Sequence, residues 1–290
     1  MISLGIYEKA LPRDISWEKR LLCAKELGFN FVEFSIDESD ERLSRLDWSE
    51  EKIAEVRQAI VTTGIPLYTM MLSGHRRYPL GSLDPKIRQK SLEIFQKAVI
   101  LAGKLGIRNI QMAGYDVFYE EKSALTREYY VENLRKCVEI AAAAQITLAI
   151  ETMDDPFINT LTDIAQFKKQ IKSPWLQAYP DLGNLSAWSG DAVPKDLENH
   201  VDLIAAIHLK DTLPVTETSK GKFKNVAFGS GCVDFKGLLK TLKRLGYSGT
   251  YTIELWSQET SDDSCQETAQ AKQFFDDIFA ELEIKQRPVI

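Results

Sequence analysis

Four polar residues each end an apolar run in the second half of the chain. Glu151 ends ITLAIE, Asp181 ends WLQAYPD, His208 ends LIAAIH and Glu254 ends TYTIE. Each run is typical of a buried strand, so each polar side chain lies where a strand leaves the core. Three carboxylates and one imidazole can converge only if the four strands are parallel neighbours. Such a mixed oxygen and nitrogen set suits Mn²⁺, Co²⁺ or Zn²⁺, and suits Mg²⁺ less well.

Any one of these residues taken alone has a simpler explanation. A single glutamate at a strand end is usually a solvated rim residue or a salt-bridge partner. The four residues end successive strands, however, and clustered carboxylates are costly without a cation. The pattern therefore favours one divalent metal ion, with open coordination positions that a chelating substrate could fill.

The chain alternates between strand and helix patterns from end to end. Strands are predicted at residues 2–7, 30–36, 66–72, 108–113, 146–151, 175–181, 203–208 and 249–255. Helices are predicted at about 16–27, 49–63, 84–105, 125–144, 161–171, 194–201, 234–245 and 262–282. This alternation is typical of the α/β class and predicts a closed (β/α)8 TIM barrel. Because no linker or low-complexity segment divides residues 1–290, we expect a single domain with its active site at the C-terminal ends of the strands.

Glycines and long loops support this organisation. Gly28, Gly64 and Gly106 each follow a helical pattern and precede a strand, which is the left-handed position that ends many helices. Two loops, 73–83 and 211–233, are longer than the helix–strand connections require. Both follow the carboxyl end of a predicted strand, where barrel enzymes place their chemistry. Loops of this length are more often functional than idle.

Composition argues against several classes of function. The 290 residues are 44% hydrophobic and 27% charged, and 36 basic against 42 acidic residues give a net charge of −6. Without a basic stripe or a patch of basic and aromatic residues, no nucleic-acid partner is expected. The chain has neither a secretory pattern nor a run of roughly 20 apolar residues, so no membrane partner is expected. Its four cysteines lack CxxC spacing, which fits a reduced, cytoplasmic setting.

Several motifs resemble those of one enzyme family. The chain is similar to sugar epimerases of the xylose-isomerase-like barrel superfamily, and within them to the L-xylulose-5-phosphate (L-ribulose-5-phosphate) 3-epimerases. The resemblance covers essentially the whole chain, and GHRRYPLGS and PDLGNLSAW are its most discriminating elements. The motifs are DESDERLSRLDWS at 37–49, SGHRRYPLGS at 73–82, ETMDD at 151–155, YPDLGNLSAW at 179–188, HLKDT at 208–212 and FGSGCVDF at 228–235.

The resemblance implies a metal-dependent 3-epimerase that acts on a phosphorylated L-ketopentose. Glu151, Asp181, His208 and Glu254 would hold the metal ion, and the two glutamates would also be the acid–base pair. One carboxylate would remove the C3 proton, which the adjacent C2 carbonyl makes acidic, and the other would return a proton on the opposite face. The metal ion would stabilise the developing enediolate as a Lewis acid.

A second group of residues is predicted to bind the substrate. Arg76, with Arg77, could hold the phosphate through forked hydrogen bonds, and a solvated position is the alternative. Strand alternation turns Lys210 inward, either to reach the substrate and balance the carboxylates or to be a solvated rim lysine. The complete group is Glu33, His75, Arg76, Asn184, Lys210 and Ser230.

Two of these positions, Glu33 and Ser230, carry more specific expectations, and so does Asp211. Glu33 points inward on the second strand, as a substrate contact or as a support for a metal ligand. The backbone N–H groups around Ser230 could cradle an anion. Asp211, three residues after His208, is a candidate hydrogen-bond partner for that histidine.

Other functions remain open at this point. An aldose–ketose isomerase, or an epimerase of an unphosphorylated ketose, would share the fold. An endonuclease-type hydrolase with this barrel uses a histidine-rich metal cluster, which the three histidines of the chain disfavour. A non-catalytic sugar-phosphate sensor is disfavoured because both Glu151 and Glu254 are retained. Barrels of this class commonly pair, so a homodimer is one expectation, although the sequence leaves the oligomeric state open.

Overall fold

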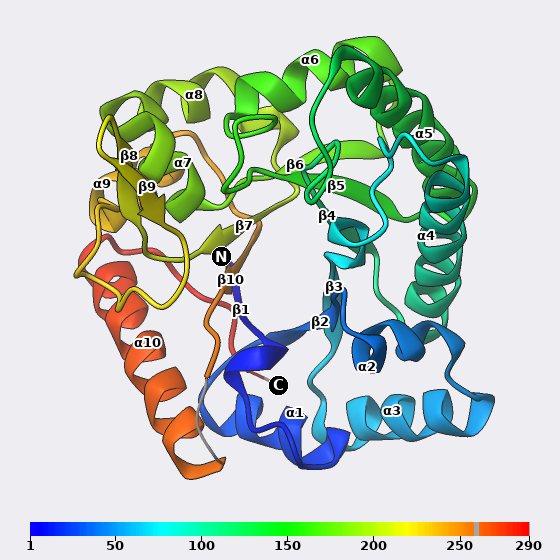
Figure 1. Ribbon diagram of the computed structural model, residues 1–290. Coiled ribbons are helices and arrows are strands. Elements are labelled where there is room, and N and C mark those ends of the chain that lie inside the picture. Colours follow the sequence, from blue (N-terminus) through cyan, green and yellow to red (C-terminus); the bar gives the residue numbers. More distant parts are fainter. Residues whose placement is uncertain (258–260, 290) are drawn as a thin grey trace.

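A ring of parallel strands forms the centre of the molecule in the computed structural model, which describes residues 1–257 and 261–289 (Figure 1). The strands of the main sheet lie in the order β6-β5-β4-β3-β2-β1-β10-β7. Their bounds are β1 (Ser3–Tyr7), β2 (Phe31–Ile36), β3 (Leu67–Leu72), β4 (Asn109–Ala113), β5 (Thr147–Glu151), β6 (Leu176–Tyr179), β7 (Ala206–Leu209) and β10 (Thr250–Ile253).

The two ends of this sheet meet between β6 and β7. Isolated parallel bridges join Ala178 to Ile204 and Asp181 to His208. All the strand pairs of the main sheet are parallel, so every strand leaves the barrel at the same end. The predicted single-domain TIM barrel is thus confirmed, in a nearly closed form.

Helices cover the outside of the barrel (Figure 1). Their bounds are α1 (Trp17–Glu26), α2 (Asp40–Leu43), α3 (Glu50–Thr63), α4 (Pro85–Leu105), α5 (Ala124–Ala143), α6 (Leu161–Ile171), α7 (Leu182–Ser189), α8 (Val193–His200), α9 (Phe235–Arg244) and α10 (Ser261–Glu281). Single 3-10 turns are η1 (Glu8–Ala10), η2 (Ser44–Asp47), η3 (Gly74–Arg76), η4 (Gly190–Ala192) and η5 (Val201–Leu203). The predicted helices correspond to the longer α-helices and to α8, with small shifts at their ends.

Three elements near the barrel mouth were not predicted from the sequence. They are α2, α7 and an antiparallel hairpin of β8 (Leu213–Thr216) and β9 (Ser219–Lys222). Side-chain caps start both helices: Ser39 accepts a hydrogen bond from the Arg42 N–H, and Asp181 accepts one from the Asn184 N–H. These elements are too short to show a clear hydrophobic period, so the sequence pattern missed them.

The two faces of the strands differ in chemistry, as β2 illustrates. Val32, Phe34 and Ile36 belong to the hydrophobic core between the sheet and the outer helices. Glu33 and Ser35 alternate with them and are fully buried inside the barrel. Because successive side chains point to opposite faces, one strand contributes to the apolar core and to a polar interior. The polar interior lies directly below the barrel mouth.

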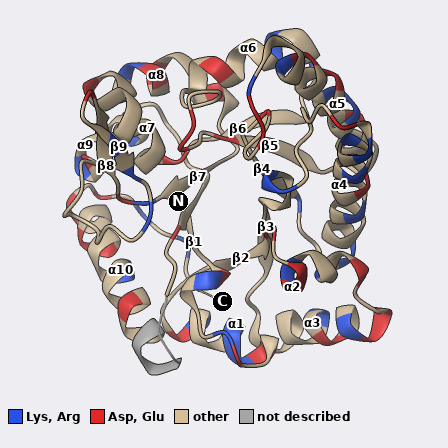
Figure 2. Ribbon diagram, viewed as in Figure 1, with Lys and Arg blue, Asp and Glu red and all other residues tan. Residues whose placement is uncertain are grey.

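The outer surface carries charges of both signs, interspersed along α3, α4 and α5 (Figure 2). In the part of the chain that the structure describes, no helix is both long enough and apolar enough to cross a bilayer.

A buried ion-pair network ties the segment after β1 to the segment after β2. The Glu8 carboxylate is buried and forms an ion pair with Arg42. Its Oε2 lies 2.8 Å from Nη1 of Arg45 and accepts a hydrogen bond of 2.8 Å from the Ser35 N–H. Removing one member of such a network leaves buried charge without compensation.

We expect Glu8→Gln to lower the free energy of unfolding by roughly 3–5 kcal/mol, because two buried guanidinium groups lose their counter-charge. Urea denaturation would measure the change. Glu55→Gln is the matched control, since Glu55 pairs with Lys52 at an exposed site and should contribute at most about 1 kcal/mol. Equal losses in the two variants would contradict the structural role of Glu8.

Candidate metal centre and active site

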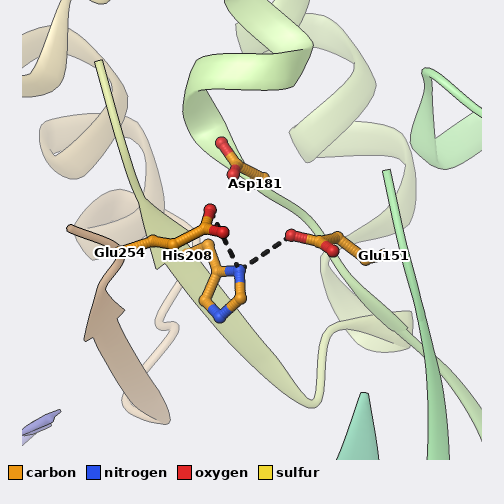
Figure 3. Close-up of side chains that lie close together, drawn as sticks. All are labelled: Glu151, Asp181, His208 and Glu254. Carbon is orange, nitrogen blue, oxygen red and sulfur yellow. Dashed lines mark hydrogen bonds and ion pairs between the residues drawn. The ribbon is translucent and has the colours of Figure 1, made fainter. Parts of the chain in front are cut away.

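The four residues that end the predicted strands meet at the barrel mouth (Figure 3). One ligand atom from each of Glu151, Asp181, His208 and Glu254 lies within 4.8 Å of all the others, and all four residues are buried. Nδ1 of His208 is 2.8 Å from Oε1 of Glu151 and 3.6 Å from Oε2 of Glu254. The structure therefore brings together the whole set that the sequence singled out.

Strand register explains why these side chains converge. Asp181 and His208 pair directly across the gap between β6 and β7. His208 also pairs with Thr252 of β10, two residues before Glu254. A step of two residues keeps a side chain on the same face of a strand. Glu151 is the last residue of β5, next to β6, and completes the group from the other side.

Lys210 adds a buried cation to this group. Its Nζ lies 2.7 Å from Oδ2 of Asp181 and 3.0 Å from Oε2 of Glu254. Burial would raise the pKa of Glu254, but the charges of Lys210 and His208 outweigh it and lower that pKa to about 2. Burial, together with the charges of Glu254 and Glu151, raises the pKa of Asp181 to about 8 despite Lys210. One lysine and one histidine thus do not stabilise three ionised carboxylates.

The donor set fits a divalent metal ion. Oδ2 of Asp181 and Oε2 of Glu254 are buried, and both lie within ion-pair distance of the ammonium group of Lys210, while Oε2 of Glu254 also lies 3.6 Å from Nδ1 of His208. The Glu151 carboxylate is held from behind by the side-chain amide of Gln111, which donates to its Oε2. Carboxylate oxygens and an imidazole nitrogen are ligands that first-row divalent metals accept. The cluster could therefore hold one such ion.

A cavity of ≈ 270 Å³ opens beside the cluster. Glu151 and Glu254 line it, and so do three of the predicted substrate residues, Arg76, Asn184 and Lys210. Its walls also contain further basic and aromatic side chains, namely Lys9, Lys224, Tyr7, Phe223 and Trp256. A ligand in this cavity would contact both glutamates and several cations at once.

Asn184 reaches the cavity because Asp181 starts helix α7. The Asn184 N–H donates to Oδ1 of Asp181 over 3.0 Å, which places the asparagine in the first turn of the helix. Its Nδ2 donates to the carbonyl oxygen of Thr152 over 2.7 Å, while its Oδ1 is buried and has no hydrogen-bond partner. That free oxygen can accept a hydrogen bond from a ligand hydroxyl group.

His75 does not line the cavity, so its position does not favour the expected substrate contact. Its Nε2 is 3.1 Å from the carbonyl oxygen of Ser91 in α4, and its ring lies near that of Phe95. Burial lowers the pKa of His75 to about 4. The 3-10 turn η3 directs this side chain toward the outer helix and leaves its neighbour Arg76 at the cavity.

The expected anion cradle at Ser230 is not formed. The N–H groups of Gly229 and Gly231 both donate to Oδ2 of Asp211 over 2.9 Å, so a carboxylate of the chain already fills the turn. The exposed Ser230 donates its hydroxyl proton to the carbonyl oxygen of Ala227. Asp211 was expected beside His208, and this is also wrong, because its side chain anchors the loop instead.

Glu33 also lies outside the cavity wall. Its Oε1 is 2.6 Å from Nε2 of His208, the ring nitrogen that faces away from Glu151. The position of Glu33 therefore does not favour a direct contact with the substrate. It agrees with the alternative expectation, that Glu33 supports a metal ligand.

Two cavity residues that sequence reasoning missed lie two positions after residues near a strand end. Lys9 follows Tyr7, and Trp256 follows Glu254. Lys224 has no such relation to a strand end, because it reaches the cavity through the long loop after β7 and β8–β9.

The chain matches one protein family over most of its length. Residues 22–278 match the model of the xylose isomerase-like TIM barrels. The chain is 50% identical over 271 residues to L-ribulose-5-phosphate 3-epimerase UlaE of Escherichia coli O157:H7, covering 93% of both chains. It is 51% identical over 259 residues to the putative L-ribulose-5-phosphate 3-epimerase SgbU of Haemophilus influenzae, covering 89% of this chain and 90% of that protein.

Solved structures of sugar epimerases have the same fold. L-ribulose 3-epimerase superposes with a TM-score of 0.77 at 18% identity and covers 98% of this chain and 96% of its own. D-allulose 3-epimerase from Methylomonas sp. in complex with D-allulose superposes with a TM-score of 0.76 at 18% identity, covering 95% and 96%. The chain belongs to the xylose isomerase-like TIM-barrel family and, within it, to the group that contains these L-ribulose-5-phosphate 3-epimerases.

Proposed function

We propose that this protein is a divalent-metal-dependent 3-epimerase that interconverts L-xylulose 5-phosphate and L-ribulose 5-phosphate. The observation that carries the proposal is the buried cluster, in which Glu151 and Glu254 come from different strand ends and both approach Nδ1 of His208 (Figure 3). The substrate is supported by two relatives, each at least 50% identical, whose names are those of L-ribulose-5-phosphate 3-epimerases. The active site would lie at the carboxyl ends of the strands.

Four side chains would hold the metal ion: Glu151, Asp181, His208 and Glu254. Their mixed donor set favours Zn²⁺, Mn²⁺ or Co²⁺ over Mg²⁺. When bound, the ion would act as a Lewis acid that stabilises negative charge on the oxygens at C2 and C3 of the ketose.

The two glutamates would also move the proton. The C3–H bond of a 2-ketose is acidic because the resulting charge is delocalised into the C2 carbonyl. One carboxylate would take this proton, and the opposite carboxylate would return a proton to the other face of C3, which inverts the centre. Which of Glu151 and Glu254 takes the proton depends on the direction of the reaction. Asn184 and Lys210 line the same cavity and would orient the substrate hydroxyl groups.

We expect Glu151→Gln and Glu254→Gln each to reduce epimerisation by at least about 100-fold, because an amide cannot accept or donate the proton. The single carboxylate that remains in each variant can still exchange the C3 hydrogen of one epimer with solvent. NMR in heavy water would measure deuterium at C3 and the ratio of the epimers. Deuterium at C1 instead would indicate an aldose–ketose isomerase.

Asp181→Asn is the matched control for this experiment, because Asp181 is a proposed ligand without a role in proton transfer. Its activity should return when the metal concentration is raised, whereas neither glutamine variant should recover. Metal content per chain would be measured for every variant. Wild-type epimerisation by either glutamine variant would contradict the two-carboxylate mechanism.

The cations at the rim of the cavity would bind the phosphate group. Nη2 of Arg76 donates to the Tyr115 hydroxyl over 3.2 Å, while its Nε is buried without a hydrogen-bond acceptor. Nζ of Lys224 lies over the Trp256 ring, 5.3 Å from its centroid. Partial burial and the charge of Arg76 lower the pKa of Lys224. An anion between these two cations would satisfy both.

We expect Arg76→Met and Lys224→Met each to lower kcat/KM for the ketopentose phosphate by roughly 10- to 100-fold, because a charge-assisted hydrogen bond is lost. The unphosphorylated ketopentose should be turned over as slowly by the variants as by the wild type. Arg77→Met is the matched control, since Arg77 is exposed and pairs with Asp40 outside the cavity. Equal losses on both substrates would contradict a phosphate site here.

A further inference from the structure

Glu33 is a carboxylate buried inside the barrel, below the proposed metal centre. It lies on β2, and none of its surface is exposed to solvent. Its nearest partners are the hydroxyl groups of Thr69 and Tyr179 and the imidazole of His208. Burying a carboxylate costs free energy unless each of its oxygens has a hydrogen-bond or ionic partner. The partners of Glu33 therefore indicate its role.

The two carboxylate oxygens of Glu33 have different hydrogen-bond partners. Oε2 accepts hydrogen bonds from Thr69 Oγ1 over 2.6 Å and from the Tyr179 hydroxyl over 2.9 Å. Oε1 is left for Nε2 of His208, at 2.6 Å. Because a carboxylate can only accept at this position, Nε2 carries a proton.

Both ring nitrogens of His208 face carboxylates in the metal-free chain, but only Nδ1 faces the metal cluster, where a bound ion would replace its proton. Nδ1 of His208 faces the cluster, 2.8 Å from Oε1 of Glu151 and 3.6 Å from Oε2 of Glu254. An imidazole nitrogen binds a metal ion only when it carries no proton, and the hydrogen bond at the second nitrogen selects that form. The contact with Glu33 therefore favours the tautomer that the metal centre needs.

Tyr179 holds both partners of this contact in place. Its ring lies against the His208 ring, with the centroids 4.6 Å apart. Its hydroxyl bonds to Glu33 and lies 3.0 Å from Oγ1 of Thr252. Because all of these side chains are buried, the orientation of the imidazole is set by the barrel interior.

We propose that Glu33 is a positioning residue of the metal centre: it accepts the Nε2–H of His208 and so presents Nδ1 as the ligand atom. The proposal rests on the metal centre described under the proposed function. It assigns a role to a residue that touches neither the substrate cavity nor the ion. It also predicts which of the two histidine nitrogens binds the metal.

The first test measures zinc affinity of the metal-free full-length chain by competition with a chromogenic chelator. Glu33→Ala should weaken zinc binding by about 10- to 100-fold, the usual effect of losing such a partner. Glu33→Gln keeps an acceptor without the charge and should lie between Glu33→Ala and the wild type. Asp116→Asn is the matched control, because Asp116 is a buried carboxylate that bonds Thr126 and Lys122 away from the cluster. It should bind zinc as tightly as the wild type.

The second test observes the histidine nitrogens directly. The chain has three histidines, so ¹⁵N-histidine labelling gives a simple long-range ¹H–¹⁵N spectrum, and His208→Gln identifies the signals of His208. In the zinc-loaded wild type, Nε2 should be protonated and Nδ1 bound to the metal. The Glu33→Ala spectrum should show this pattern weakened or replaced, whereas the Asp116→Asn spectrum should retain it. A purely structural role for Glu33 would not change the tautomer.

Two results would overturn the role of Glu33 and leave the proposed function intact: wild-type zinc affinity in both Glu33 variants, or zinc bound through Nε2 of His208 in the wild type. Failure of the wild type to bind zinc, manganese or cobalt would overturn the metal centre itself and this inference with it. The wild-type spectrum decides the question even if Glu33→Ala does not fold.

Discussion

The structure depends on one electrostatic constraint, the burial of three carboxylates and an imidazole within a few ångströms of one another. Mutual repulsion and loss of hydration both oppose this arrangement. Parallel strands make it geometrically possible, because the carboxyl ends of adjacent strands meet at one rim of the barrel. Lys210 supplies positive charge between Asp181 and Glu254, yet burial and neighbouring charges still raise the pKa of Asp181 to about 8. A divalent cation would complete the charge balance.

The barrel interior can be understood as layers that serve this site. Outer faces of the strands pack against the helices, while inner faces carry polar side chains such as Glu33, Thr69, Gln111 and Tyr179. These inner residues hydrogen-bond to Glu151 or His208 from below, directly or through one another. Long loops above the strands supply the cavity wall. Inner strand residues can thus hold the metal ligands in place, while the loops above the strands can differ in the residues that contact the substrate.

The sequence predicted the strands because each is a local apolar pattern, and it predicted the cluster because four of these patterns end at a polar residue. Loop residues were predicted less well, because partners distant in sequence determine their positions. His75 faces the Ser91 carbonyl in α4, and Asp211 occupies the turn at Gly229 and Gly231. Neither contact has a signature in the local sequence. Helix α7 and the β8–β9 hairpin were missed for a related reason, since short elements show too few periods to identify.

The central claim is that Glu151, Asp181, His208 and Glu254 hold one divalent ion. X-ray diffraction from crystals of the manganese- or zinc-loaded protein, recorded on both sides of the absorption edge of the metal, tests it most directly. The account predicts one anomalous peak within about 2.0–2.3 Å of one atom from each residue, with Nδ1 as the histidine ligand. It also predicts that the ammonium group of Lys210 is displaced from between Asp181 and Glu254. Absence of a peak at the cluster, with Lys210 still paired to both carboxylates, would contradict the account.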